Sequence, residues 1–552
     1  MQIVHDVHDF EACRSSYQPK IPSALEGNPA RRSVAPPEPV SLEASRCFPH
    51  LGDLPSVVFS GGSASSQSQS AQRVGVILSG GPAPGGHNVI AGLFDGLQRA
   101  GVAGSLVGFR GGVSGLLTND ARELEETVVN GYRNTGGFDM IGTGRTRLET
   151  EAQFSKALEV ARERGLTGLV VVGGDDSNTN ACALAERARA AGSPLCVVGV
   201  PKTIDGDLRG QRIETSFGFD TACKTYSGII GNIHRDAVSM RKYWHFIKIM
   251  GRSASHIALE CALQTHPTLV LISEEISQRE LALHDLVDHI ADVICYRGNR
   301  GENFGSVLIP EGIVEFVPEM RALITELNEA LVAHAGELAA LETLPHKREF
   351  VTGCLSPAPS GLFRRLPREI ANQLILDRDP HGNVQVAKID IQRLFLELVE
   401  SRLHTMTQRG VYRGVFSPQT HYLGYEGRCA PPSNFDADYA YALGLTSAFL
   451  LRDGLSGMMA TVRNLARPAA EWEAGGTPLA RMMEFNRRHG QDVPVIRKAL
   501  VNLEGPVFQS LQSQRDNWSR TTRFRYPGPL QYFGPREICE RTTLTLELES
   551  RR

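Results

Sequence analysis

The sequence has no run of about 18 apolar residues, the length that a membrane-spanning helix needs. Its first residues, Met1–Asp6, lack the basic and then apolar pattern of a signal peptide, so we expect a cytoplasmic protein. The charges nearly cancel, since 58 Lys and Arg residues against 61 Asp and Glu residues give a formal net charge of −3. This balance gives no general attraction to nucleic acid or to an anionic membrane, and neither is expected as a partner.

The ten cysteines include no C-x-x-C pair, and several lie within apolar runs, as Cys196 does. Buried, reduced thiols in a cytosolic protein are the expected interpretation. The rest of the composition is ordinary, with 41% hydrophobic and 22% charged residues among 552. It excludes wholesale disorder and fibrous repeats, and the length suggests roughly two to four domains.

From residue 73 onward, short apolar runs alternate with helical patterns. Continuous runs of Val, Ile and Leu are typical of strands buried on both faces of a parallel sheet. The alternation therefore predicts a doubly wound α/β fold. The candidate strands are Val74–Leu78, Leu169–Val172, Cys196–Val200, His245–Met250, Thr268–Ile272 and Ser306–Ile309.

Three parts of the chain depart from this alternation. Residues 1–72 are Pro-rich and then rich in Gly, Ser and Gln, which is typical of an extension and linker, so periodic structure is expected to begin at Arg73. An amphipathic stripe over residues 315–343 predicts a helical insert at about 314–405, and is too short and too Ala-broken to favour a coiled coil. Residues 451–552 are expected to pack on the core, with Thr543–Leu548 as an edge strand.

A Gly-rich motif, Ser79–Asn88, follows the first predicted strand and precedes a helix. Backbone N–H groups and the helix N-terminus could bind an anion there, and a tight turn without a ligand is the alternative. The motif is not a Walker A loop, since no Gly-Lys-Ser/Thr follows, and its glycines do not fit the dinucleotide fingerprint.

Two further polar motifs follow predicted strands, where open α/β sheets bind their ligands. Val172–Asn180 contains Gly-Gly-Asp-Asp, and its adjacent carboxylates fit a Mg²⁺ that carries phosphate oxygens, whereas helix capping explains only one of them. In Val200–Asp207, Asp205 could take a proton from an alcohol, and Lys202 could neutralise a transferring phosphoryl group. A solvated turn is the alternative for this third motif.

Together with four other segments, these motifs resemble the pyrophosphate-dependent phosphofructokinases, in particular their long form of the catalytic, beta-like type. The seven motifs occur in order over roughly residues 73–450: Gly80–Gly85, Gly173–Ser177, Pro201–Asp207, Phe217–Ala222, Ile249–Arg252, Leu308–Gly312 and Tyr425–Arg428. The resemblance implies two doubly wound α/β/α phosphofructokinase-like domains, with a diphosphate-binding domain at 73–215 and a fructose 6-phosphate-binding domain at 216–450. The implied reaction is reversible phosphoryl transfer from pyrophosphate to the 1-hydroxyl of fructose 6-phosphate, in glycolysis and gluconeogenesis.

The resemblance also assigns roles to individual residues. Gly80 and Arg145 would contact the phosphates, Asp175 would hold Mg²⁺, and Asp205 would be the base. The expected sugar-phosphate ligands are Thr203, Ile204, Met250, Gly251, Arg252, Glu274, Tyr425 and Arg428.

Two of the residues expected at the sugar phosphate come from a neighbouring subunit. The resemblance implies that Lys242 and Tyr243 reach the partner's substrate, and hence a homodimer with shared active sites. For Lys242 the alternative is a solvated basic patch, and for Glu274 it is a surface acid beside Glu275.

Asp176 and Lys202 decide the expected phosphoryl donor. Relatives that use ATP have Gly where this chain has Asp176, and a carboxylate there would occupy the place of a nucleotide α-phosphate and repel it. Lys202 would supply the positive charge that pyrophosphate needs. An ATP-dependent 6-phosphofructokinase is therefore the less favoured alternative.

A non-catalytic regulatory subunit of the same fold is the second alternative. Such a chain would lack parts of the Gly-Gly-Asp-Asp and Thr-Ile-Asp motifs, and both are intact here. One departure from the family concerns the loop after Arg145, where Thr146 and Arg147 stand in place of the usual Asp-Lys. Arg147 keeps a cation, although Arg and Lys are not interchangeable at close contacts.

Overall fold

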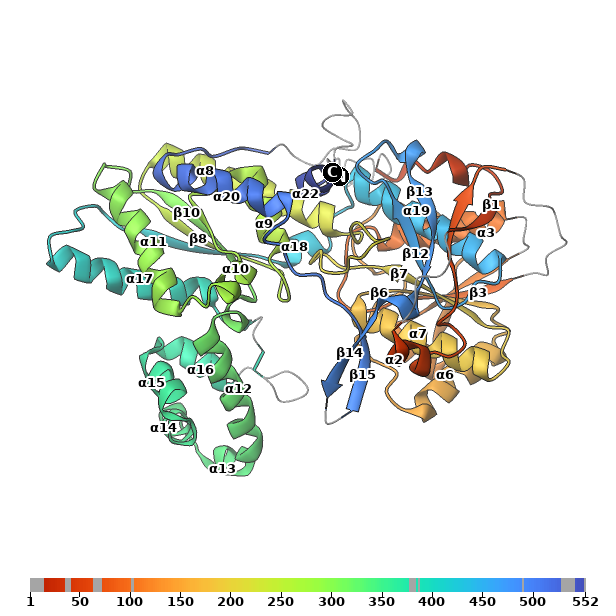
Figure 1. Cartoon of the computed structure of the whole chain (residues 1–552), viewed down its shortest axis with the longest axis horizontal. Helices are drawn as coiled ribbons and strands as arrows, with labels where there is room; N and C mark the ends of the chain where they lie inside the picture. Colours follow the sequence, from red (N-terminus) through yellow and green to blue (C-terminus); the bar gives the residue numbers. More distant parts are fainter. Residues whose placement is uncertain are drawn as a thin grey trace, which may run out of the picture. The chain divides into compact units, whose positions relative to one another are not determined.

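The computed structural model describes residues 14–34, 41–62, 72–100, 104–376, 384–385, 388–488, 491–527 and 542–550. The chain forms two compact units (Figure 1). The first consists of Met1–Thr225, Tyr425–Ala499 and Leu530–Arg552, and the second of Tyr226–Gly424 and Leu500–Pro529. Each unit combines segments far apart in the sequence, whereas the sequence analysis divided the chain into consecutive domains.

A nine-stranded sheet with a parallel centre forms the first unit. The five strands from β12 to β4 are parallel, and the strands on either side of them pair antiparallel. In spatial order the strands are β1 (Ala30–Val34), β2 (Ser56–Ser60), β13 (Glu473–Pro478), β12 (Met458–Arg463), β7 (Cys196–Pro201), β6 (Gly168–Gly173), β3 (Arg73–Leu78), β4 (Ser105–Phe109) and β5 (Ala121–Glu123).

Helices cover both faces of this sheet. Leu169 and Val171 of β6 share a hydrophobic core with α6 and α7, and Val170 and Val172 face the opposite side, because side chains alternate along a strand. On that opposite side α3 and α19 pack against each other. Among the residues that the structure describes, the helices of the unit are α2 (Leu42–Cys47), α3 (Gly86–Arg99), α4 (Val113–Thr118), α5 (Glu126–Asn130), α6 (Glu151–Glu163), α7 (Asp175–Ala190), α18 (Tyr425–Arg428), α19 (Asn434–Arg452) and α22 (Leu544–Glu549).

The contact between α3 and α19 depends on glycine. A Cβ atom added at Gly444 would lie 2.2 Å from the carbonyl oxygen of Val89, and one added at Gly92 would lie 2.1 Å from that of Tyr441. Real side chains essentially never come this close, so each glycine lets the other helix's backbone approach.

We expect Gly444→Ala to lower the free energy of unfolding by about 1–3 kcal/mol, the usual cost of overpacking a core. This loss has to exceed the gain in helix propensity, which is at most about 1 kcal/mol. Urea unfolding followed by circular dichroism measures the change. Gly353→Ala is the matched control, since Gly353 also lies in a helix, α14 (Leu344–Cys354), but has open space around its missing Cβ. Equal stabilities of the two variants would contradict this account of the contact.

Two predictions for the ends of the chain are wrong. Ordered structure begins before Arg73, because Val57, Val58 and Phe59 are buried in β2, which pairs with β1 and β13. The Ser- and Gln-rich stretch at 63–71 lies outside the described residues.

The segment Thr543–Leu548, predicted as an edge strand, belongs to helix α22 instead. The Thr543 hydroxyl accepts a hydrogen bond from the backbone N–H of Leu546 at 3.4 Å, which caps the helix. The capped helix is therefore more stable here than the strand that the alternation of polar and apolar residues predicted.

The second unit has a four-stranded parallel sheet. Its spatial order is β11 (Pro418–Leu423), β8 (Trp244–Ile249), β10 (Gly305–Pro310) and β9 (Leu269–Val270). The helix α8 (Phe219–Met240) begins in the first unit and ends in the second. The other helices beside the sheet are α9 (His256–Thr265), α10 (Ser273–Gln278), α11 (Leu283–Gly298), α17 (Ile391–Gln408) and α20 (Pro506–Arg520).

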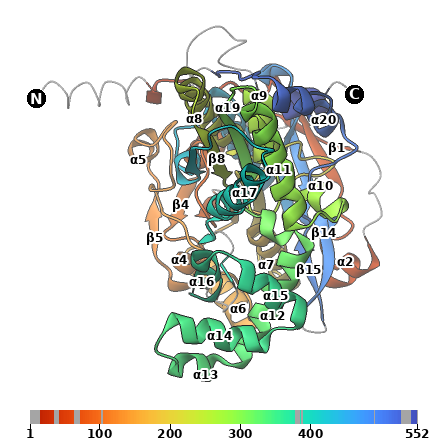
Figure 2. The same cartoon turned by 90° about the vertical axis from the view of Figure 1, so that its left-hand side faces the viewer.

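The predicted insert is helical and shares one hydrophobic core with this sheet. Before α17 its helices are α12 (Pro318–Ala333), α13 (Ala335–Ala340), α14 (Leu344–Cys354), α15 (Pro357–Arg365) and α16 (Arg368–Leu376), which Figure 2 shows as one cluster. The amphipathic stripe is divided between α12 and α13, with His334 between them. Within the described ranges, no helix has the length and hydropathy of a membrane span.

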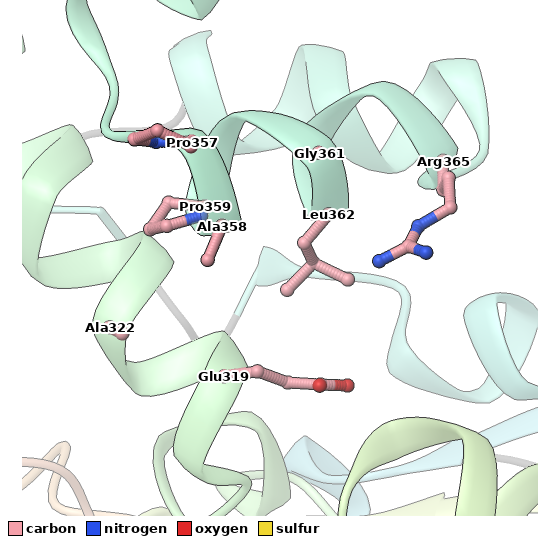
Figure 3. A pocket seen from close by; sticks show the side chains of 8 residues that line it. All are labelled: Glu319, Ala322, Pro357, Ala358, Pro359, Gly361, Leu362 and Arg365. Atoms are coloured by element: carbon pink, nitrogen blue, oxygen red, sulfur yellow. The ribbon is translucent and has the colours of Figure 1, made fainter.

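A cavity of about 330 Å³ lies between α12 and α15. Figure 3 shows the side chains of Glu319 and Arg365 beside it, and Pro357, Pro359 and Leu362 form much of its apolar wall. None of the site residues predicted from the sequence lines it.

Candidate active site

The Gly-rich loop after β3 is fixed by backbone hydrogen bonds within the first unit. The N–H of Gly80 donates to the carbonyl of Gly144 at 2.9 Å, and the Thr143 hydroxyl donates to the carbonyl of Gly80 at 2.7 Å. Gly80 has φ +82°, a conformation that favours glycine. The loop therefore reaches α3 in a shape set by the neighbouring 142–145 turn.

Asp175 and Asp176 occupy the first turn of α7. Gly174 is the N-cap and makes no side-chain capping bond, so capping does not account for the two carboxylates. Their negative charges do suit the positive end of the helix dipole. Asp176 forms an exposed ion pair with Arg147, one of the two residues at which the sequence departs from the pattern of the phosphofructokinases that it resembles.

Lys202 is the buried cation of the site, with 6% of its surface exposed. Its Nζ donates to the carbonyl of Gly81 at 2.8 Å, which joins the end of β7 to the Gly-rich loop. The pKa of Lys202 is lowered to about 8, mainly by burial and also by the charges of Arg428 and Arg145, while Asp205 and Asp175 act in the opposite direction. Four other predicted site residues thus lie within electrostatic reach of one amine.

The loop after Lys202 carries the proposed base. The Thr203 hydroxyl accepts from the N–H of Asp205 at 3.0 Å, and Asp205 is half-buried. Asp207, two residues on, is buried, and burial together with the charge of Asp205 raises the pKa of Asp207 to about 7. Two carboxylates in one motif thus have different environments, and the more accessible one is Asp205.

Arg428 of α18 lies against the Gly-rich loop. A Cβ atom added at Gly81 would be 1.5 Å from an Arg428 guanidinium nitrogen, so only glycine leaves room for that group. The resemblance assigns Arg428 to the sugar's 6-phosphate, while the structure places it beside the loop expected to bind diphosphate. Tyr425, on the same short helix, is 70% exposed, with the Arg428 guanidinium 5.5 Å from its ring centre.

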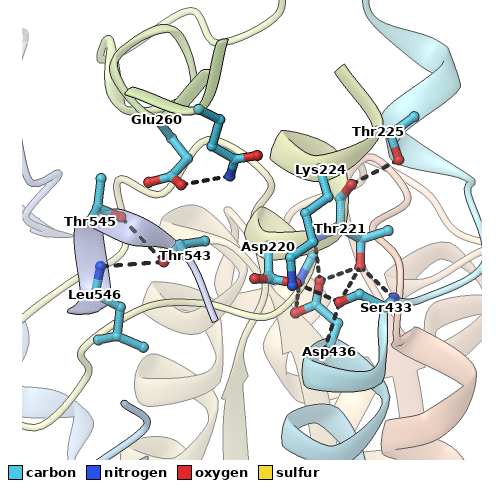
Figure 4. Close-up of polar contacts among 12 residues, drawn as sticks. Asp220, Thr221, Lys224, Thr225, Glu260, Ser433, Asp436, Thr543, Thr545 and Leu546 are labelled. Carbon is cyan, nitrogen blue, oxygen red and sulfur yellow. Dashed lines mark hydrogen bonds and ion pairs between the residues drawn. The ribbon is translucent and has the colours of Figure 1, made fainter. Parts of the chain in front are cut away.

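A buried polar cluster explains the Phe217–Ala222 motif (Figure 4). Asp436 at the start of α19 accepts hydrogen bonds from the N–H groups of Gly218 at 2.9 Å and Thr221 at 2.8 Å. Burial, with the charge of Asp220, raises the pKa of Asp436 to about 7. Since the Ser216 hydroxyl donates to the carbonyl of Thr203 at 3.0 Å, this cluster is linked to the loop that carries the base.

In the second unit, the motif Leu308–Gly312 packs against the loop of the motif Ile249–Arg252. Glu311 accepts a hydrogen bond from the N–H of Gly251 at 3.3 Å, and a Cβ atom at Gly312 would lie 1.8 Å from the carbonyl oxygen of Arg252. Leu308–Gly312 therefore supports the backbone of Met250, Gly251 and Arg252, the residues expected at the sugar. Gly251 has φ +131°, and the Arg252 side chain is exposed.

Glu274 is not a surface acid, because only 6% of it is exposed. One of its carboxylate oxygens, Oε1, accepts from the N–H groups of Ser255 at 3.1 Å and Val501 at 3.0 Å. The other, Oε2, is buried and has no hydrogen-bond partner among the described residues. A buried acceptor without a partner is costly, and a ligand hydroxyl would satisfy it.

Lys242 and Tyr243 follow α8 in the same unit. Lys242 is exposed, and its Nζ lies 4.8 Å from the centre of the Tyr243 ring.

Sequence reasoning missed three charged residues, Asp207, Glu311 and Lys498. Asp207 and Glu311 lie inside motifs already singled out, but only the structure shows that both carboxyl groups are buried. Lys498 has no motif around it, yet its Nζ is 3.5 Å from Asp175 Oδ2.

Comparisons with known proteins identify the family of the chain. The phosphofructokinase family matches residues 73–347. The pyrophosphate–fructose 6-phosphate 1-phosphotransferase of Treponema pallidum is 51% identical over 97% of this chain and 96% of its own, and that of Porphyromonas gingivalis is 49% identical over 97% and 98%. A pyrophosphate-dependent phosphofructokinase structure from Nitrosospira multiformis shares the fold, with a TM-score of 0.53 at 16% identity, over 86% of this chain and 98% of that one. The chain therefore belongs to the phosphofructokinase family, among the pyrophosphate–fructose 6-phosphate 1-phosphotransferases.

Proposed function

We propose that the protein transfers a phosphoryl group from pyrophosphate to the 1-hydroxyl of fructose 6-phosphate, giving fructose 1,6-bisphosphate and phosphate, and that it also catalyses the reverse reaction. The relatives that match almost the whole chain carry this activity in their names. The observation that carries the proposal is the buried amine of Lys202. It contacts the Gly-rich loop, and the charges of Asp175 and Asp205 raise its pKa against the effect of burial.

Asp205 acts as the general base in this mechanism. It takes the proton of the sugar's 1-hydroxyl while that oxygen attacks the terminal phosphorus of pyrophosphate, and the bridging P–O bond breaks to release phosphate. Lys202 and Arg145 stabilise the negative charge of the donor and of the leaving phosphate. Gly80 allows the backbone to approach the phosphates closely.

The residues present fit a Mg²⁺ that arrives with the donor. Mg²⁺ typically takes one or two carboxylates together with phosphate oxygens and water. Asp175 offers one accessible carboxylate, and among the described residues no group of three His, Cys, Asp or Glu side chains forms a cage for a metal. Asp175 would hold the ion, which would shield the charge of the pyrophosphate when bound.

The sugar phosphate is assigned to the remaining residues by their chemistry. Glu274 offers its unpartnered oxygen to a sugar hydroxyl, and Met250, Gly251 and Arg252 form the supported loop just before Ser255, whose N–H donates to Glu274. Thr203, Ile204, Tyr425 and Arg428 complete the predicted set. The homodimer, with Lys242 and Tyr243 reaching the partner's substrate, and the cytoplasmic location stay predictions.

An assay of the purified protein with fructose 6-phosphate tests the proposal. Pyrophosphate should support turnover, ATP should give little or none, and a chelator should abolish activity. The reverse reaction, with fructose 1,6-bisphosphate and phosphate, should be readily measured. An enzyme that prefers ATP would instead be the ATP-dependent alternative, and a chain inactive with both donors would be the regulatory one.

A further inference from the structure

A lysine near the end of the second segment of the first unit, Tyr425–Ala499, lies at the Gly-Gly-Asp-Asp motif. Lys498 follows the hairpin β14 (Met483–Arg488) and β15 (Gln491–Ile496), and its Nζ is 3.5 Å from Asp175 Oδ2. More than 300 residues separate these partners in the sequence. The contact is therefore produced by the fold.

Backbone hydrogen bonds hold the chain on both sides of this lysine. The N–H of Ile496 donates to the Thr179 hydroxyl on α7 at 3.2 Å, and the N–H of Ala499 donates to the carbonyl of Asp207 at 2.7 Å. Neither bond involves the Lys498 side chain. These hydrogen bonds hold the segment against α7 and against the loop that carries Asp205 and Asp207. A substitution of Lys498 would leave them in place.

The surroundings of Lys498 are rich in carboxylates. Asp175 and Asp205 both raise the pKa of the buried Asp207, and Lys498 opposes them. A pyrophosphate anion that approaches these groups is repelled unless cations face it. The Lys498 side chain is 38% exposed, whereas Lys202 is buried and fixed by the Gly81 carbonyl, so the two amines have different freedom to move.

We propose that Lys498 is a second lysine of the donor site, which pairs with Asp175 when no donor is present and donates to the oxygens of pyrophosphate when the donor binds. This inference rests on the proposed function, since it concerns the same anion. A long, flexible stem with three rotatable donors suits such a move between a carboxylate and a phosphate oxygen. The role is one of binding, and no covalent bond of Lys498 forms or breaks.

Calorimetric binding of methylenediphosphonate, a pyrophosphate analogue that cannot be cleaved at its bridge, tests the proposal at a fixed Mg²⁺ concentration. Lys498→Met should raise the dissociation constant of the analogue about 10-fold, the usual effect of losing a hydrogen bond to a charged group. Lys498→Arg should recover part of the loss. The KM for pyrophosphate should rise in parallel, while binding of fructose 6-phosphate should change less than about 2-fold.

Arg497→Met is the matched control. It removes the same charge from the neighbouring position, where Arg497 is 73% exposed and pairs with Glu484 at 3.1 Å. It should bind the analogue as the wild type does. Unchanged binding in Lys498→Met, or an equal loss in Arg497→Met, would overturn the role of Lys498. A wild type that neither binds the analogue nor uses pyrophosphate would instead refute the proposed function.

Discussion

Asp205→Asn should lower kcat by about 100-fold or more, because a positioned general base commonly contributes that much. The KM for fructose 6-phosphate should stay within about threefold of the wild-type value, since the amide keeps the size of the side chain and one acceptor oxygen. Steady-state kinetics at saturating pyrophosphate measures both quantities.

Asp207→Asn is the comparison that identifies the base. The pKa of Asp207 is raised to about 7 by burial and by the charge of Asp205, so near neutral pH much of this carboxyl is already protonated and the amide imitates that form. We expect it to cost less than about tenfold in kcat. Near-normal turnover in Asp205→Asn, or a larger loss in Asp207→Asn, would assign the base elsewhere.

The second large effect concerns the donor. Asp176→Gly should raise the ratio of kcat/KM for ATP to that for pyrophosphate by at least about tenfold, because it removes a charge and a side chain from the expected place of an α-phosphate. Asp176 is exposed and paired with Arg147, which weakens its repulsion of an α-phosphate. We therefore expect a smaller effect than a buried, unpaired carboxylate would give. Asp176→Asn separates the two causes, since it removes the charge and keeps the size.

Lys202→Met should lower kcat for pyrophosphate by about 10²–10³-fold, a loss typical of removing a preorganised group that stabilises transition-state charge. Lys202 and Asp176 face one donor, so the effects of Lys202→Met and Asp176→Gly should not add in the double variant. A ratio of ATP to pyrophosphate efficiency that does not rise in Asp176→Gly would contradict the role of Asp176.

The lowered pKa of Lys202 sets an alkaline limit for the same reaction. An amine with a pKa of about 8 is charged below that pH and neutral above it, so kcat/KM for pyrophosphate, which reports the free enzyme, should fall as the pH rises through about 8. A bound anion favours the charged form, so the limb in kcat should appear at higher pH. In Lys202→Met this alkaline limb should be absent.

Much of the parallel sheet could be predicted because strands buried on both faces are continuous apolar runs. The run Leu169–Val172 became β6, and Cys196–Val200 became β7. Thr268–Ile272 was too long, since only Leu269 and Val270 pair as β9. By contrast, Glu473–Pro478 (β13) has no apolar run, and its place depends on pairing with β12 and β2.

The candidate site likewise has a part that the sequence predicts and a part that it does not. Lys202, Asp175 and Asp205 lie within short motifs at strand ends, where local sequence already indicates an anion site. The contact of Arg428 with Gly81 and that of Lys498 with Asp175 join segments hundreds of residues apart. Such contacts depend on the packing of the whole unit, and no local pattern encodes them.

The order of strands in the first unit has a consequence during synthesis on the ribosome. One edge of β7 pairs with β12, which begins about 260 residues later in the chain. At roughly 5–20 residues per second, that edge waits about 10–50 s for its partner. An exposed row of unpaired N–H and C=O groups invites pairing with other nascent chains, so a protein truncated before Met458 should aggregate rather than fold as a smaller enzyme.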